Sequence, residues 1–187
     1  MTYYGGKELA AAFRTVRGNT IRIAEEIPED KYDFKAAPDT RSIRQMLVHI
    51  ALGPTFAFEI HANKVTDLKT VNFMEMMQKH GAAEAKARTK AEILAFLKSE
   101  GERFASYLDG LSEAFLAEPV TMMPGDTVAT KSRFEMLLGA KEHEMHHRGQ
   151  LMLAERMVGV VPHLTRDRQA RMAQAQAAQA QPSATRH

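Results

Sequence analysis

The stretch Lys141 to Met152, which reads KEHEMHHRGQLM, places three histidines and two glutamates in a segment that otherwise has the pattern of a core helix. Residues four apart in an α-helix lie on one face, so His143 and His147 can aim their imidazoles at a common point. His146 lies roughly 100° around the helix from His147. Two ligands from one helix do not complete a metal site, so we expect a third from elsewhere in the chain.

The helix that contains this stretch has an apolar face along its length. At positions 136, 140, 143, 147, 151, 154 and 158, helical spacing gives Met, Ala, His, His, Leu, Ala and Val, so the two histidines are the polar exceptions. Ser132 and Glu135 form a capping-box pair at its start, and Gly159 is a natural C-cap at its end. His146 and Gln150 lie off the apolar face, and we expect them around the ligands rather than among them.

Three further amphipathic helices are predicted. One runs from Gly6 to the residues before Pro28, a second begins near Arg41, and a third opens at Thr89. Residues 112–131 contain two prolines and read as a long connection with a turn at MPGD. Four such helices without an alternating strand pattern predict an all-α four-helix bundle.

The domain division follows from the composition along the chain. Residues 1–164 form the predicted bundle, including a long insertion at 63–88 between the second and third helices. The insertion holds Met74, Met76 and Met77, which indicate either packing on the bundle or a flexible wall for an apolar ligand. Residues 165–187 are rich in Ala and Gln and have no face to bury, so they are predicted to be a loosely held or partly helical extension.

The overall composition narrows the classes of function. The chain has 187 residues, no cysteine and a formal net charge of +2, much of which comes from arginines after residue 164. Without cysteine there is no disulfide framework and no cysteine nucleophile, so any thiol chemistry needs a thiol from outside. No signal peptide, membrane span or basic stripe is visible. We therefore expect a cytoplasmic protein that binds neither membranes nor nucleic acid.

The second helix supplies the missing ligand. His49 lies in an apolar stripe with Met46, Leu52, Phe56 and Ile60. A single histidine on an apolar face is more often a hydrogen-bonded core residue than a ligand. Three of them would leave six ring nitrogens to satisfy, whereas a divalent ion takes one nitrogen from each ring. The pattern thus predicts a metal site at His49, His143 and His147, suited to Zn, Ni, Fe or Mn.

The letters from His143 to His147 also match the H-E-x-x-H motif of zinc proteases. The extended form of that motif needs Gly and His at positions 150 and 153, where this chain has Gln150 and Leu153. No sheet is predicted that could hold an extended peptide. Proteolysis is therefore disfavoured, and Glu144 remains only a weak candidate for a catalytic base.

Two segments resemble the signature segments of the DinB/YfiT-like superfamily, namely SIRQMLVHIA at 42–51 and HEMHHRGQL at 143–151. The resemblance covers roughly residues 5 to 162. It implies an up-down-down-up four-helix bundle, commonly dimeric, with a divalent metal held by one histidine of the second helix and two of the fourth. Carried over, these are His49, His143 and His147. Arg41 stands where many relatives have Trp, and Gln45 where they often have an acidic residue, which bears on substrate specificity.

The resemblance also implies a class of reaction. Several characterised relatives are transferases or isomerases that use a low-molecular-weight thiol, and the lack of cysteine fits a thiol supplied as a cosubstrate. The leading hypothesis is a homodimeric, metal-dependent thiol S-transferase acting on a small electrophile. Two alternatives remain open: a non-catalytic metal-binding stress-response module, and a hydrolase that uses metal-activated water.

Overall fold

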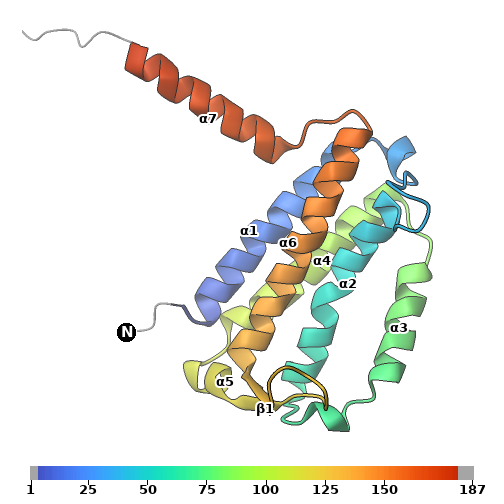
Figure 1. Cartoon of the computed structure of the whole chain (residues 1–187), viewed down its shortest axis with the longest axis vertical. Coiled ribbons are helices and arrows are strands. Elements are labelled where there is room, and N and C mark those ends of the chain that lie inside the picture. Colours follow the sequence, from blue (N-terminus) through green and yellow to red (C-terminus); the bar gives the residue numbers. More distant parts are fainter. Residues whose placement is uncertain (1–3, 181–187) are drawn as a thin grey trace, which may run out of the picture.

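The computed structural model describes residues 4–180, and four long helices form its body (Figure 1). They are α1 (Gly6–Glu26), α2 (Ile43–Ala62), α4 (Lys90–Asp109) and α6 (Arg133–Met157). From the N-terminus, α1 and α6 run in one direction while α2 and α4 run in the other. Helices α4 and α6 each pack against both α1 and α2. The predicted four-helix bundle with up-down-down-up topology is confirmed.

The predicted helix starts are confirmed by their caps. The Ser42 hydroxyl accepts a hydrogen bond from the Gln45 amide, and the Gln45 side chain in turn accepts one from the Ser42 amide. Thr89 and Glu92 form the same reciprocal pair at the start of α4. Each cap satisfies backbone donors that have no partner within the helix. Helix α6 starts after Ser132 and ends at Met157, two residues before Gly159.

The insertion between α2 and α4 accounts for the unusual direction of α4. It contains a 3₁₀ turn, η2 (Leu68–Thr70), and helix α3 (Phe73–Ala85), which returns the chain alongside α2 so that α4 starts at the same end as α2 (Figure 1). Helix α3 has no buried residue, and the side chains of Met74 and Met77 are 69% and 60% exposed. Of the two readings of the methionine cluster, a ligand wall is not favoured, because the side chains of Met74 and Met77 are largely exposed to solvent.

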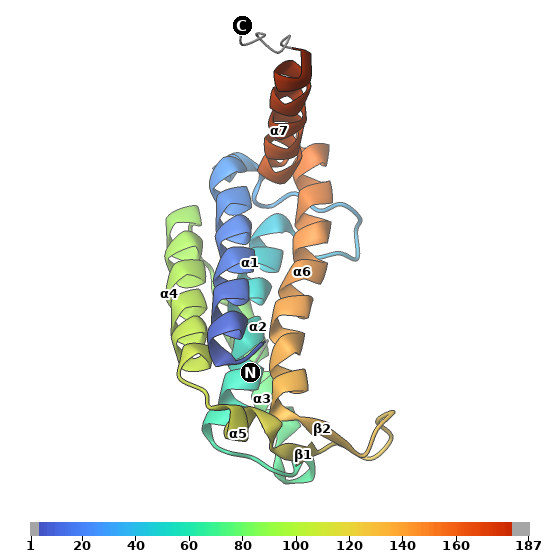
Figure 2. The same ribbon diagram turned by 90° about the vertical axis from the view of Figure 1, so that its left-hand side faces the viewer.

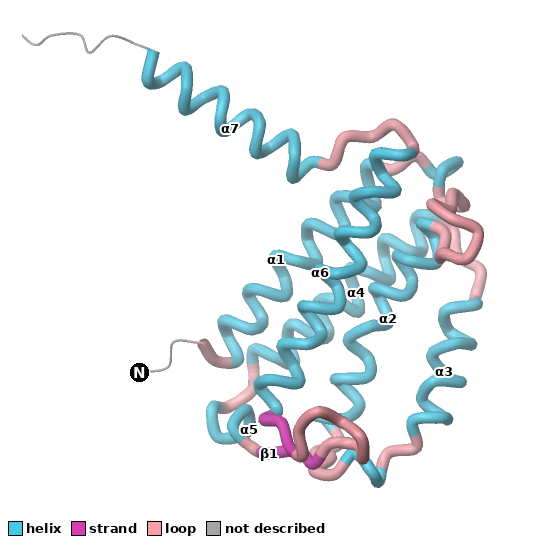
Figure 3. The backbone as a smooth tube through the Cα atoms, in the orientation of Figure 1, coloured by secondary structure: helices cyan, strands magenta, loops and turns pink. Residues whose placement is uncertain are grey.

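The connection between α4 and α6 contains structure that the sequence pattern did not predict. A short helix α5 (Glu113–Ala117) precedes a two-stranded antiparallel hairpin of β1 (Pro119–Thr121) and β2 (Thr130–Ser132), with Val120 paired to Lys131 (Figure 3). Strands of three residues are too short to show alternation. The predicted turn at MPGD is confirmed, since the Asp126 amide donates to the Met123 carbonyl and Gly125 has a positive φ of 96°.

One buried arginine ties the four bundle helices together. Arg17 of α1 is 3% exposed, and its guanidinium donates to both carboxylate oxygens of Glu144 on α6. It also donates to the Leu97 carbonyl on α4 and the Ile50 carbonyl on α2. The Ile50 carbonyl needs this donor because Pro54, four residues on, has no amide hydrogen to give it. We call these four groups, the Arg17 guanidinium, the Glu144 carboxylate and the carbonyls of Leu97 and Ile50, the Arg17 network.

Helix α7 (His163–Ala180) extends from the end of the bundle beyond α6 (Figure 2). Its first turns are held to α1, because Asp167 pairs with Arg22 and Arg166 pairs with Glu26. Residues 168–179 are exposed. The extension expected from residue 165 is thus helical up to 180, and its last seven residues, 181–187, lie outside the described part. Between residues 4 and 180, no helix combines the length and apolar character needed to span a membrane.

Candidate metal centre

The three predicted ligands converge near the middle of α2 and α6. His49 projects from α2, and His143 and His147 project from successive turns of α6; one nitrogen from each ring lies within 4.8 Å of the other two. The Nε2 atoms of His49 and His143 are 3.1 Å apart. Two nitrogens bound to one tetrahedral ion at about 2.0–2.1 Å would lie roughly 3.3 Å apart. The spacing of His49 and His143 therefore matches that of two ligands of one ion, and the third ring is close enough to join them.

Glycine at position 53 makes room for this arrangement. A Cβ atom there would lie 2.8 Å from Nδ1 of His143 and 2.9 Å from its Cε1. Any larger residue on this turn of α2 would collide with the imidazole and displace it. The Gly53-Pro54 pair thus has two roles in the fold. Gly53 leaves space for the His143 ring, and Pro54 leaves the Ile50 carbonyl available to accept a hydrogen bond from Arg17.

Two of the imidazoles are oriented through their second nitrogen. Nδ1 of His49 lies 3.3 Å from Oε2 of Glu84 on α3, and Nδ1 of His147 lies 2.8 Å from Oε1 of Gln150. A carboxylate and an amide oxygen only accept hydrogen bonds, so these contacts favour a proton on Nδ1 and a lone pair on Nε2. Partners of this kind fix the tautomer and the ring direction of metal-binding histidines.

Burial keeps the three rings neutral. Desolvation is the main cause that lowers the pKa of His49, His143 and His147, and the neighbouring histidines contribute further. For His143 the pKa falls to about 4. Neutral imidazoles are the form that ligates metal. The site therefore presents three uncharged donors at neutral pH, as a divalent cation requires.

The other predicted site residues divide into two groups. Gln150 contacts His147 directly, and its side-chain amide nitrogen lies 3.3 Å from Nε2 of His146, which is exposed and packs against the His147 ring. Both therefore lie beside the three predicted ligands. Glu144 lies elsewhere: it is 1% exposed, and both its oxygens accept hydrogen bonds from Arg17. This geometry argues against a role for Glu144 as a base, because its lone pairs are already engaged.

Glu84 is a site residue that the sequence did not reveal. It lies in the charged, Ala-rich end of the insertion, far from either signature segment. Its second oxygen, Oε1, accepts a hydrogen bond of 2.7 Å from Nε of Arg41. Because α3 has no buried face, no periodic apolar pattern marked the position of Glu84. Only the folding of α3 back along α2 brings it to His49.

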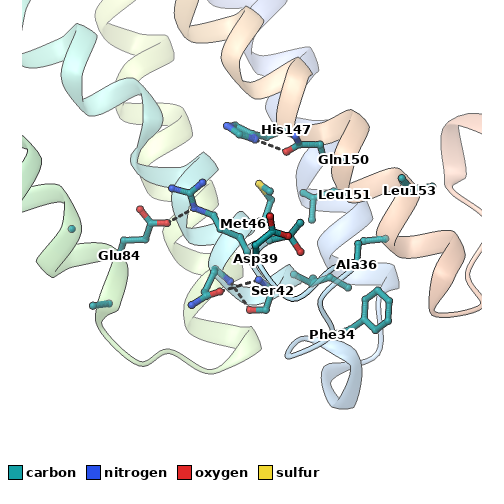
Figure 4. Close-up of a pocket in the computed structure, with 17 residues that line it drawn as sticks. Phe34, Ala36, Asp39, Ser42, Met46, Glu84, His147, Gln150, Leu151 and Leu153 are labelled. Atoms are coloured by element: carbon teal, nitrogen blue, oxygen red, sulfur yellow. Dashed lines mark hydrogen bonds and ion pairs between the residues drawn. The ribbon is translucent and has the colours of Figure 1, made fainter.

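A cleft with a volume of about 750 Å³ opens beside the centre (Figure 4). His147 and Gln150 of α6 and Glu84 of α3 contribute polar groups to its lining, and apolar side chains cover much of the rest. The lining comes from the loop before α2, the first turns of α2, the end of α3 and the second half of α6. The apolar members include Phe34, Met46, Leu151 and Leu153. Met74, Met76 and Met77 are not among the described residues that line this cleft.

Known proteins resemble this chain in sequence and in fold. The sequence pattern of the DinB superfamily matches residues 12–151. The uncharacterised protein YjoA of Bacillus subtilis is 23% identical over 154 residues, which is 81% of this chain and 90% of YjoA. The crystal structure of YjoA, described as a DinB-like protein, superposes with a TM-score of 0.60 at 21% identity, covering 81% of this chain and 92% of that one.

A second solved structure shares the fold at lower identity. YfiT of Bacillus subtilis is described as "a probable metal-dependent hydrolase with an unusual four-helix bundle topology". It superposes with a TM-score of 0.64 at 14% identity, covering 86% of this chain and 91% of YfiT. The superfamily match spans both halves of the histidine site, on α2 and on α6. The chain belongs to the DinB superfamily.

Proposed function

We propose that this protein binds a divalent metal ion through His49, His143 and His147 and uses it to make small molecules react in the adjoining cleft. The observation that carries the proposal is the convergence of three imidazole donors within 4.8 Å of one another beside that cleft. Three protein ligands leave coordination positions open, which is typical of catalytic rather than structural sites. Zn, Ni, Fe and Mn all suit such a donor set.

The leading reaction is transfer of a low-molecular-weight thiol to a small electrophile. When bound, a divalent ion lowers the pKa of a coordinated thiol or water molecule and so supplies a nucleophile near neutral pH. In the transfer, a sulfur lone pair forms the new C–S bond, the leaving group departs with its bonding electrons, and the thiol proton passes to solvent. The chain has no cysteine, so the thiol has to arrive as a cosubstrate.

The residues of the chain have distinct parts in this scheme. Glu84 and Gln150 engage Nδ1 of two of the imidazoles, which leaves Nε2 of each ring for the ion. The apolar lining from Phe34, Met46 and Leu151 excludes water from the body of a bound molecule. Glu144 has no part as a base in this scheme, because both its oxygens accept hydrogen bonds from Arg17.

Hydrolysis by metal-activated water is the second candidate. It is favoured by the description of YfiT, which shares the fold, as a probable metal-dependent hydrolase. The two candidates differ in one requirement that is simple to measure. A thiol transferase is inactive until thiol is added, whereas a hydrolase acts on esters or amides without it.

The first test is the metal content of the purified protein. We expect about one divalent ion per chain in the wild type and its loss in His147→Ala. His146→Ala is the matched control, since it removes an exposed imidazole from the adjacent position of the same helix. Metal uptake that does not depend on His147 would overturn the proposed centre.

The second test is a panel of thiols with a chromogenic electrophile, run with and without metal. Conjugation that needs both supports the transferase, and ester hydrolysis without thiol supports the second candidate. Failure of both reactions would indicate a non-catalytic metal-binding module. In that case chelation should lower the melting temperature strongly while no activity is lost, because the ion contributes folding free energy.

The oligomeric state and the cellular location of the protein are part of the same proposal. We expect a homodimer, in line with the family resemblance of the two signature segments, and a cytoplasmic location. Light scattering of the purified protein gives the mass in solution, and a mass of one chain at micromolar concentration would contradict the dimer. Cell fractionation tests the location.

A further inference from the structure

Arg41 stands where the metal centre meets the cleft. Its Nε donates to Oε1 of Glu84 at 2.7 Å, and Oε2 of Glu84 lies 3.3 Å from Nδ1 of His49. Arg41, Glu84 and His147 all line the cleft. A single carboxylate therefore links the guanidinium to a predicted metal ligand, and the guanidinium borders the same space that a bound molecule would occupy.

Most of the hydrogen-bonding capacity of Arg41 is unused. Over residues 4–180, Nε is the one nitrogen of its side chain that donates to another protein group. Arginine carries five N–H donors in a planar fork, so the four on the terminal amino groups remain for a ligand. The side chain is 41% exposed. The guanidinium is therefore accessible to a molecule in the cleft, and folding has not already removed it from water.

The charges around the cleft favour an anion once a metal is present. Asp39 and Glu84 are the two carboxylates of the lining and Arg41 is its guanidinium. These three side chains together carry a slightly negative charge, and a divalent ion held by neutral imidazoles would make the net charge of the cleft positive. Asp39 is exposed, whereas Glu84 is already paired with Arg41 and His49. The positive side of the cleft then lies between the ion and Arg41.

We propose that Arg41 binds a carboxylate of the small molecule that occupies this cleft, while the apolar part of that molecule packs against Phe34, Met46 and Leu151. The inference rests on the proposed function, because the occupant is taken to be a substrate or cosubstrate of the metal centre. The planar fork of arginine matches a carboxylate in two parallel hydrogen bonds. The carboxylate can belong either to the thiol or to the electrophile.

The test measures binding of paired probes to the zinc-loaded, full-length protein by calorimetry. Mercaptoacetate and mercaptoethanol are small thiols with and without a carboxylate. Hexanoate and hexanamide have the same apolar tail and no thiol, so they represent the electrophile. Each pair is measured with the wild type, Arg41→Gln and Arg14→Gln. Arg14 is a matched control, since it is 40% exposed and pairs with Glu102 at the same 2.7 Å, on the α1–α4 side of the bundle.

We expect the wild type to bind the carboxylate member of at least one pair about tenfold more tightly than its neutral partner. In Arg41→Gln that preference should fall to about twofold or less, whereas affinity for the neutral probe and zinc content stay unchanged. Arg14→Gln should keep the preference. A preference confined to the mercaptoacetate pair assigns the carboxylate to the thiol, and one confined to the hexanoate pair assigns it to the electrophile.

Two results would overturn the role of Arg41. One is the absence of any carboxylate preference in the wild type, and the other is a preference that survives undiminished in Arg41→Gln. Failure of the proposed function looks different: the protein would take up no zinc or would not conjugate thiols. If zinc is taken up but thiols are not conjugated, the hexanoate pair still tests Arg41, because it involves neither a thiol nor a reaction.

Discussion

His143 and Glu144 are neighbours on α6, yet they belong to polar regions of opposite character. In the Arg17 network, both oxygens of Glu144 accept hydrogen bonds from Arg17, and further donors of Arg17 are used by backbone carbonyls of α2 and α4. At the histidine site, the side-chain partners hold Nδ1 of His49 and His147, and the Nε2 atoms of His49 and His143 face each other. In one region the groups of the chain satisfy one another, and in the other three imidazoles turn toward a common point.

The difference shows how one helix serves both stability and function. Adjacent residues of an α-helix point about 100° apart, so α6 turns Glu144 toward α1 and His143 toward α2. A buried ion pair whose hydrogen bonds are all made contributes to holding helices in place. Three neutral imidazoles grouped beside a cleft contribute little to folding and much to ligand binding. The following substitutions test this contrast, beginning with the largest expected effect.

Breaking the Arg17 network should cost the most stability. Glu144→Gln leaves the Arg17 guanidinium buried without its counter-charge, and we expect the free energy of unfolding to fall by about 3–5 kcal/mol. Urea denaturation followed by circular dichroism measures it. The metal-free His147→Gln variant should differ from the metal-free wild type by less than about 1 kcal/mol. Equal losses in both variants would remove the contrast between the two regions.

Glu155 lies eleven residues after Glu144 on α6. Substituting it should raise the free energy of unfolding at high pH, whereas substituting Glu144 lowers it. It is fully buried and neither oxygen has a hydrogen-bond partner among the described residues. Desolvation, followed by the charge of Glu26, raises the pKa of Glu155 from 4.5 to about 7. The folded protein thus holds a proton that the unfolded chain releases between these values. The resulting contribution to stability is present below pH 4.5 and is lost as the pH rises through about 7.

Glu155→Gln removes this titration, so it should gain stability relative to the wild type as the pH rises. We expect the difference between the two proteins to move by about 1–3 kcal/mol in favour of the variant between pH values of about 5 and 9. Urea denaturation at a series of pH values measures the shift. A difference that does not depend on pH would show that Glu155 is ionised throughout, as a fully paired carboxylate would be.

Gly53→Ala should damage the histidine site and spare the Arg17 network. The added methyl group would meet the His143 ring at 2.8 Å, so the imidazole has to move away from its partners. We expect metal affinity to fall roughly 10- to 100-fold, the range typical of disturbed ligand surroundings. Competition with a chromogenic chelator gives the affinity. Gly149→Ala is the control, since a Cβ there meets nothing within 4 Å and should leave metal binding unchanged.

The smallest effect is expected from the orienting hydrogen bond of His147. Gln150→Ala removes the oxygen that accepts from Nδ1, and metal affinity should fall about tenfold because the ring and its tautomer are less well fixed. Glu142→Ala, at an exposed position of the same helix, serves as the control. If Gln150→Ala binds metal as tightly as the wild type, packing alone orients His147.

The sequence predicted the bundle and the three ligands because both depend on local periodicity. The caps at Ser42 and Thr89 fix where helices begin, and four-residue spacing fixes which histidines of α6 share a face. The hairpin was missed because three-residue strands are shorter than the pattern that identifies strands. The place of Met74 was left open between two readings, because methionine clusters indicate an apolar surface without saying what covers it.

By itself, then, the sequence determined the four helices, the inward direction of His49, His143 and His147, and the need for an external thiol in any thiol chemistry. Only the tertiary structure decided that Glu144 pairs with Arg17, that Gly53 admits His143, and that Glu84 reaches His49. Each of these contacts joins residues far apart in sequence. Periodicity reports which face of a helix is buried, but the partner on that face depends on how the helices pack.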